Sequence, residues 1–292
     1  MSKDGHGRLQ VEKFQHFVPK MQLKRFTGLN GKLSVWNKRA GKLLQQAPNN
    51  TFGETHLYTI ENERGEKDTS FEKALSKVEA TAANLIDAIE GAVEQGRAPT
   101  FSASEKASLD LFFYTAWKRV PDFFGKAESI NAGPEFLDEI FGALLIKHPD
   151  REAEIDALNT PQSRKRLLQA GKVQGMAIPS ERILNILARR GLTILQLPPG
   201  GYGFLIGSLP IARTRHPLTD PEAEAWMPIS PRLVIGLGMA EDTVTLGEFD
   251  PIRLTGFNRT IAAQSTMFGG PNPAQVKEMA EWLAIENVKF DR

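Results

Sequence analysis

The chain of 292 residues contains no cysteine, and this absence excludes several kinds of chemistry. Without thiols there is no disulfide, no thiolate nucleophile and no cysteine-ligated zinc site. The sequence also lacks any apolar run of the roughly 18 to 20 residues that a membrane helix needs. Its first residues have no apolar signal segment. We therefore expect a soluble, cytoplasmic protein with no membrane partner.

An excess of either charge is also missing, since 36 basic residues face 35 acidic ones. A balanced chain has no global field that would hold a polyanion, so nucleic-acid binding would need a local basic patch. No Gly-rich phosphate loop and no His-Glu-x-x-His motif occur, and no cofactor is evident. A divalent metal is left open without any ligand spacing that supports it, and so is the oligomeric state.

The residues that are present indicate an N-terminal β portion followed by helices. We expect a loose polar tail at 1–13 and a single α+β domain over 14–292, with a sub-boundary near 190 as the alternative. Three short β-prone runs between 32 and 60, the last at 56–60, predict a small meander. Capping-box patterns, Thr69 with Glu72 and Ser102 with Glu105, predict two helix starts, and more helix is expected to 190.

Apolar runs at 192–197, 203–206 and 232–237 predict C-terminal strands, which only a closing helix at 273–285 interrupts. The order of strands, helices and strands is typical of an α+β fold. In that fold the two β portions share one mixed sheet around a helical core. The alternative is a small β piece on a helical domain, with a separate C-terminal sheet.

The segment His16-Phe17-Val18-Pro19, followed by Lys24-Arg25-Phe26, is too irregular to follow from amphipathicity alone. It resembles the opening motif of the DUF4238 family, a bacterial domain of unknown function. Further segments are similar to that family: Glu54 to Tyr58, the helix from Phe71 to Glu79 with its paired glutamates, Arg119 to Pro121, the run ending in Ser208-Leu209-Pro210, and Asn258 before a final helix. The resemblance implies a fold family without implying a reaction.

One position departs from the family pattern. Leu209 stands where the family has an aspartate, so a carboxylate suited to metal or proton chemistry is missing. If that aspartate is catalytic in the family, this member is impaired.

The motif histidine is the first candidate for a functional residue. His16 could act as a base, a phosphate contact or a metal ligand, and the alternative is a half-buried histidine that bonds the backbone. Lys24 and Arg25 could grip a phosphate or could be cations that suit a helix end.

Two glutamates of the first long helix are the next candidates. Glu72 and Glu79 lie on one helix face about 10 Å apart, too far for one cation to bind both. Glu72 has a capping role, so Glu79 is the stronger functional candidate. Arg119 could reach the same pocket.

Three further residues are supporting candidates. Glu54 and Tyr58 flank a strand and could point to the same region, with packing as the alternative. Ser208 lacks the Gly-x-Ser-x-Gly elbow of a nucleophile. Aromatic residues at 112–117 could stack on bases, but such clusters in an amphipathic helix are more often core.

Two hypotheses remain open. The first is a hydrolase of phosphodiester bonds, nuclease-like, built around His16, Glu79 and Arg119 with Glu54 or Glu72 in support. The second is a non-catalytic binding or interaction protein in which the same residues brace the fold. The two differ in whether these side chains meet in an open pocket or in the core.

Overall fold

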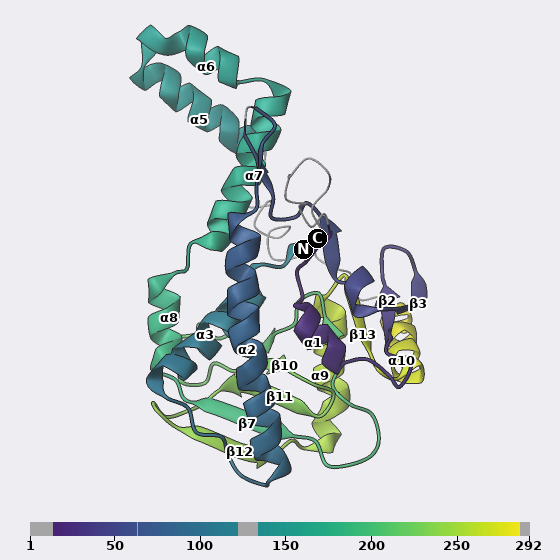
Figure 1. The fold of residues 1–292 in the computed structure, drawn as a ribbon. Coiled ribbons are helices and arrows are strands. Elements are labelled where there is room, and N and C mark those ends of the chain that lie inside the picture. Colours follow the sequence, from purple (N-terminus) through teal and green to yellow (C-terminus); the bar gives the residue numbers. More distant parts are fainter. Residues whose placement is uncertain (1–13, 63, 122–133, 287–292) are drawn as a thin grey trace, which may run out of the picture.

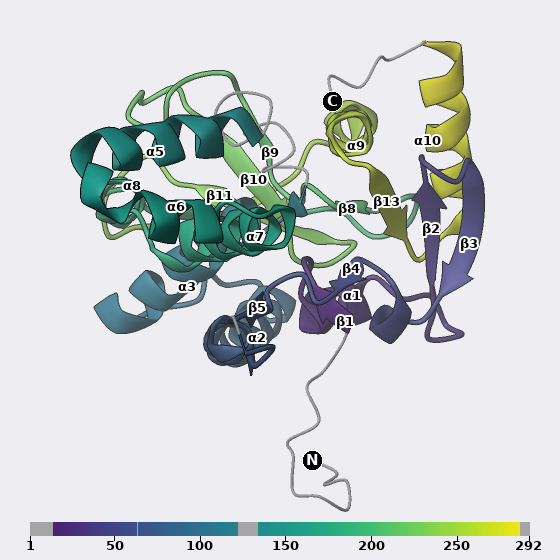
Figure 2. The ribbon, with the colours of Figure 1, turned by 90° about the horizontal axis from the view of Figure 1, so that it is seen from above.

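The computed structural model describes residues 14–62, 64–121 and 134–286, and Figures 1 and 2 show its arrangement. The predicted loose tail at 1–13 lies outside these residues. Over the described part the chain is an α+β fold, as predicted, with two main sheets, two short strand pairs and helices between and around them.

The N-terminal β portion differs from the predicted meander. Strand β1 (Phe14–His16) pairs antiparallel with β4 (Gly53–Thr55), while β2 (Leu33–Asn37) and β3 (Lys42–Gln46) form a hairpin. The predicted strand at 56–60 is wrong for its first four residues, because His56 has a φ of 58° and starts a turn. The next strands, β5 (Ile60–Glu61) and β6 (Lys67–Asp68), form a small hairpin.

The helical block is confirmed. Helix α2 (Ser70–Glu94) is the longest, and Figure 1 shows it running down the molecule while α5 and α6 project at one end. The other helices of this part are α1 (Lys20–Arg25), α3 (Ala103–Lys118), α5 (Pro134–Lys147), α6 (Glu152–Leu158), α7 (Pro161–Ala177) and α8 (Glu181–Ala188), with short 3-10 turns at Pro48–Asn50 and Pro149–Arg151.

The two β portions do share a sheet. Its order is β3-β2-β13-β8, so N-terminal strands pair with β13 (Met267–Gly270), which in turn pairs with β8 (Ile206–Gly207). The larger sheet, β12-β7-β11-β10-β9, contains C-terminal strands only. Its members are β7 (Leu192–Gln196), β9 (Ala212–Arg213), β10 (Ala225–Pro228), β11 (Leu233–Leu237) and β12 (Val244–Glu248).

The main core lies between the five-stranded sheet and the pair α2 and α3. Phe112, Phe113 and Tyr114 of α3 are buried, which confirms that the aromatic run is core. A second apolar cluster joins α1 and β2 to residues near β8 and β11. The closing helix α10 (Pro273–Ile285) packs on α9 and on the four-stranded sheet, as Figure 2 shows.

Helix α9 (Pro251–Gln264) was not predicted. Gly256 and several Thr and Asn residues lower its helix propensity, which hid it in the C-terminal run of strands. Asp250 caps it by accepting a hydrogen bond from the Ile252 amide at 2.9 Å, and Pro251 occupies the first turn. This Asp-Pro start is the signal that could have found it. Asn258 therefore lies within α9 and precedes the final helix α10, as predicted.

One predicted capping box is wrong and the other is confirmed. Ser102 and Glu105 make both bonds of the box at the start of α3. Thr69 makes no side-chain cap on α2, so the predicted capping box is not formed. Instead Asp68 Oδ1 accepts a hydrogen bond from the Ser70 amide at 2.8 Å, and bonds to Ser70 lower the pKa of Asp68.

This geometry predicts which residue stabilises the start of α2. Asp68→Ala should lower the free energy of unfolding by about 1 kcal/mol, the usual cost of removing a side-chain cap. Thr69→Ala should change it by less than about 0.5 kcal/mol, as for a surface substitution. Urea unfolding of both variants at pH 7 measures the difference, and a larger loss for Thr69→Ala would contradict the assignment.

Candidate functional site

Arg119, directly after α3, lies at the centre of a cluster of the motif residues. Its side chain is 2% exposed. The guanidinium donates to the Phe17 carbonyl at 2.7 Å, to the His16 carbonyl at 2.9 Å and to Glu79 Oε1 at 2.5 Å. One buried cation therefore joins β1, α2 and the end of α3.

Tyr58 completes this cluster from the turn after β4. Its hydroxyl donates to the Arg119 carbonyl at 3.0 Å. Gln15, fully buried in β1, accepts from the Tyr58 amide at 2.7 Å and donates to the Thr59 hydroxyl at 3.2 Å. Burial strongly raises the pKa of the Tyr58 phenol, so the hydroxyl stays a donor at neutral pH. We call Gln15, Tyr58, Glu79 and Arg119, with the carbonyls of His16 and Phe17, the Arg119 network.

The two charged side chains of the network, Arg119 and Glu79, differ in their exposure to solvent. Burial disfavours the Arg119 cation, but the Glu79 carboxylate outweighs this, and the pKa of Arg119 is raised. The Glu79 side chain is 24% exposed, so one side of the ion pair reaches solvent. Glu72, two turns nearer the start of α2 on the same face, adds a weaker attraction to Arg119.

His16 joins the network through its backbone, and its ring points elsewhere. Nε2 lies 2.9 Å from the Pro48 carbonyl, which can only accept, so Nε2 carries a proton. The Phe14 ring packs edge-on against the imidazole, with ring centroids 5.2 Å apart. Burial lowers the pKa of His16, although the bond to Pro48 and the charge of Glu79 oppose the shift. The imidazole is therefore neutral at pH 7.

The strand pairing beside His16 leaves room for glycine only. His16 faces Gly53 in the β1–β4 pair, and a Cβ on Gly53 would lie 2.6 Å from the Phe14 ring. Phe52, just before it, has a φ of 53° and accepts the Phe17 amide at 2.9 Å. The motif segment is thus held in register by tight local packing.

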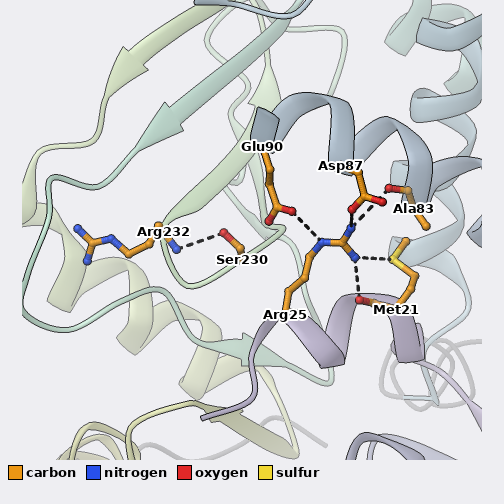
Figure 3. Close-up of polar contacts among 7 residues, drawn as sticks. All are labelled: Met21, Arg25, Ala83, Asp87, Glu90, Ser230 and Arg232. Carbon is orange, nitrogen blue, oxygen red and sulfur yellow. Dashed lines mark hydrogen bonds and ion pairs between the residues drawn. The ribbon is translucent and has the colours of Figure 1, made fainter. Parts of the chain in front are cut away.

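The two motif cations on α1 have different surroundings. Arg25 contacts Asp87 and donates to Glu90 at 3.3 Å and to the Met21 carbonyl at 2.8 Å, as Figure 3 shows. Its guanidinium thus ties α1 to α2. Lys24 is exposed in the last turn of α1, where a cation favours the helix dipole.

A small hollow lies beside the network. Phe17, Glu54 and Thr266 are among its lining residues, and its volume is about 70 Å³. This is room for about two water molecules, whereas sites for small molecules usually measure about 300 to 1,000 Å³. Glu54 is exposed at the edge of this hollow and is not bonded to Arg119 by any contact in the described residues.

Ser208 and Leu209 lie in the C-terminal β portion. Ser208 Oγ accepts from the Thr266 amide at 2.9 Å, and its own amide donates to the Met267 carbonyl at 2.8 Å. It therefore joins β8 to β13. Leu209 packs against the second apolar cluster, and its amide donates to the Ser265 hydroxyl at 3.1 Å. At the family's aspartate position this chain has an apolar packing contact.

Sequence reasoning missed the buried amides that hold the motif. Gln15 was one, and Gln22 of α1 is another: it is fully buried and donates to the Pro228 carbonyl of β10 at 2.6 Å. A single sequence gives no signal for them, because glutamine is usually exposed. Gln22 links α1 to the five-stranded sheet.

Metal and membrane features are absent from the described residues. Over 14–62, 64–121 and 134–286 no three His, Asp or Glu side chains gather in an arrangement that could hold a metal ion. No helix in the same ranges is both long and apolar enough to cross a membrane.

The geometry defines an α+β protein whose N-terminal motif is anchored by a buried arginine. Residues 15–268 match the profile of a family described as "Protein of unknown function (DUF4238)", and the chain belongs to this family. The family resemblance of the motif segments is thereby confirmed. No match was found among curated proteins or among solved structures.

The lowered pKa of His16 predicts a pH-dependent stability. A neutral buried histidine stabilises the fold above its ordinary pKa of about 6.5, and this contribution is lost as the pH falls toward the folded-state pKa. The free energy of unfolding should therefore fall between pH 7.5 and 5.5, by at most about 1.4 kcal/mol per pH unit from this group. Urea unfolding of the wild type at both pH values measures it.

His16→Gln should weaken this pH dependence, whereas His216→Gln, which changes an exposed histidine, should keep it. An equal slope in all three proteins would show that His16 is not the titrating group.

Proposed function

We propose that the protein is a non-catalytic binding protein whose motif residues brace the fold, and that its partner is a nucleic acid. The observation that carries the first part is the burial of Arg119. An arginine that stabilises a reacting oxyanion must present donors to a substrate, whereas Arg119 directs Nε, Nη1 and Nη2 at two carbonyls and Glu79.

The hydroxyl of Tyr58 and the amide of Gln15 support the same proposal. The Tyr58 hydroxyl bonds the Arg119 carbonyl at the end of α3, and the Gln15 amide oxygen bonds the backbone of the turn after β4. Buried polar groups of this kind are costly when unpaired, so their bonds fix one arrangement of β1 and its neighbours. The nearby hollow of about 70 Å³ is smaller than a nucleotide-sized site requires.

The hydrolase hypothesis remains the second candidate. His16 favours it, because a neutral imidazole can accept a proton at Nδ1 and lies near the Glu79 charge. In that case His16 and Glu79 would be needed for turnover and not for stability. The nucleic-acid partner fits either candidate and also fits the expected cytoplasmic location.

If Glu79 and Arg119 brace the fold, replacing either residue should cause a large loss of stability. Glu79→Gln should lower the free energy of unfolding by about 1 to 3 kcal/mol and Arg119→Lys by about 3 kcal/mol or more, because each leaves a buried group of the network poorly paired. Glu94→Gln is the matched control, since Glu94 is exposed on the same helix α2. Urea unfolding at pH 7 measures all three.

An unchanged free energy of unfolding in Glu79→Gln and Arg119→Lys would contradict the brace. If a phosphodiester substrate were also turned over about 100-fold more slowly by these variants, the hydrolase candidate would replace it.

A further inference from the structure

A groove of about 840 Å³ lies between α7 and the β5–β6 hairpin, and it adjoins the Arg119 network at Thr59, whose hydroxyl accepts from Gln15. Helix α7 and strand β5 are neighbours, and Figure 1 shows α7 in the upper part of the molecule, below α5 and α6. The Arg166 guanidinium donates to the Asn62 carbonyl at 3.4 Å, and Gln169 donates to the Leu57 carbonyl at 2.8 Å. These bonds fix one wall of the groove against the other.

The charge of this groove is strongly unbalanced. Five lysine and arginine side chains line it, and Glu61 is the one carboxylate among the lining residues, while Arg164 is also paired with Asp138 of α5. The whole chain has a net charge of only +1, so the basic charge is local. Three of these cations are consecutive residues of α7: Arg164, Lys165 and Arg166. This is the kind of patch that a balanced chain needs in order to bind a polyanion.

The cations are spread along the groove. Lys172 follows Lys165 by seven residues, which places it about 10 Å further along the helix axis. Lys67 lies on the opposite wall, with Nζ 3.2 Å from His56 Nε2. Arg166 donates to two neutral oxygens, those of Asn62 and Ser163, so its charge is not balanced by these contacts. A ligand with repeated charges fits such a row better than a single anion does.

The uncharged residues that line the groove also favour a ligand with phosphate groups. Thr55 and Gln162, both exposed, add a hydroxyl and an amide group. Together with lysine and arginine these are the side chains that contact phosphate oxygens in nucleic-acid complexes. The lining residues in the described part of the chain include no Phe, Tyr or Trp on which bases could stack.

We infer that this groove binds the phosphodiester backbone of a nucleic acid, with little preference for base sequence. The inference rests on the proposed function, since it locates the partner proposed there. It places the contact on α7 and the β5–β6 hairpin instead of on the motif cations Lys24 and Arg25.

The test is binding of a fluorescein-labelled 20-nucleotide single strand of mixed sequence, followed by anisotropy between 50 and 200 mM NaCl. The variant is Lys67→Glu with Lys165→Glu, two exposed residues on opposite walls. The control is Lys32→Glu with Lys42→Glu, two exposed residues at the β2–β3 hairpin, far from α7 in Figures 1 and 2. Both pairs change the net charge equally.

The groove variant should bind at least 10-fold more weakly than the wild type at 50 mM NaCl, and the slope of log K against log salt should become shallower by roughly 1 to 2. The control should bind within about twofold of the wild type. Thermal unfolding of the variants confirms that both pairs keep the fold.

Four outcomes would overturn the inference. Wild-type binding that the groove variant retains would remove the groove and leave the proposed partner standing. Absence of wild-type binding to single strand or duplex would remove the nucleic-acid partner and the groove together. Displacement of the oligonucleotide by poly-glutamate at equal charge concentration would assign the groove to an acidic protein, whereas displacement by inorganic phosphate at a similar concentration would assign it to a single anion.

Discussion

The ion pair between Arg119 and Glu79 is the interaction on which the motif region depends. Arg119 follows α3, Glu79 lies in α2, and the guanidinium also holds two carbonyls at the end of β1, those of His16 and Phe17. A buried arginine is costly to desolvate, and its cost is offset only when every donor has a well-placed acceptor. The position of β1 follows from the need of the Arg119 donors for these acceptors.

The network also explains why the motif looks irregular in sequence. The residue types of the motif follow from contacts between segments that are far apart in the chain. They do not follow from the periodicity of one helix or strand. Gln15 bonds the turn after β4, Gln22 bonds β10, and Arg25 bonds α2. Such contacts fix the N-terminal segment between the helical block and the sheets. A separate surface, the groove beside α7, is then available for a partner.

Sequence patterns predicted the long elements and not the irregular ones. The apolar spacing in α2 and the capping box at Ser102 correspond to real helices because those signals are local. The turn at His56 depends on a left-handed backbone that its neighbours impose, and α9 is held by tertiary packing despite Gly256. The candidate residues His16, Glu79 and Arg119 could be grouped from their family resemblance, but their burial could not. The Arg164-Lys165-Arg166 run of α7 was not predicted as a binding patch, although three consecutive cations are a signal that the sequence carries.

The state of the Arg119 guanidinium itself is the most direct test of this account. In a ¹⁵N-correlated NMR spectrum at pH 7, the Arg119 Nε–H should exchange slowly with water, and its Nη protons should give separate signals, because bonds to Phe17, His16 and Glu79 restrict the group. Arg119→Lys identifies the signal. A rapidly exchanging, rotationally averaged guanidinium, like that of an exposed arginine, would contradict the buried brace.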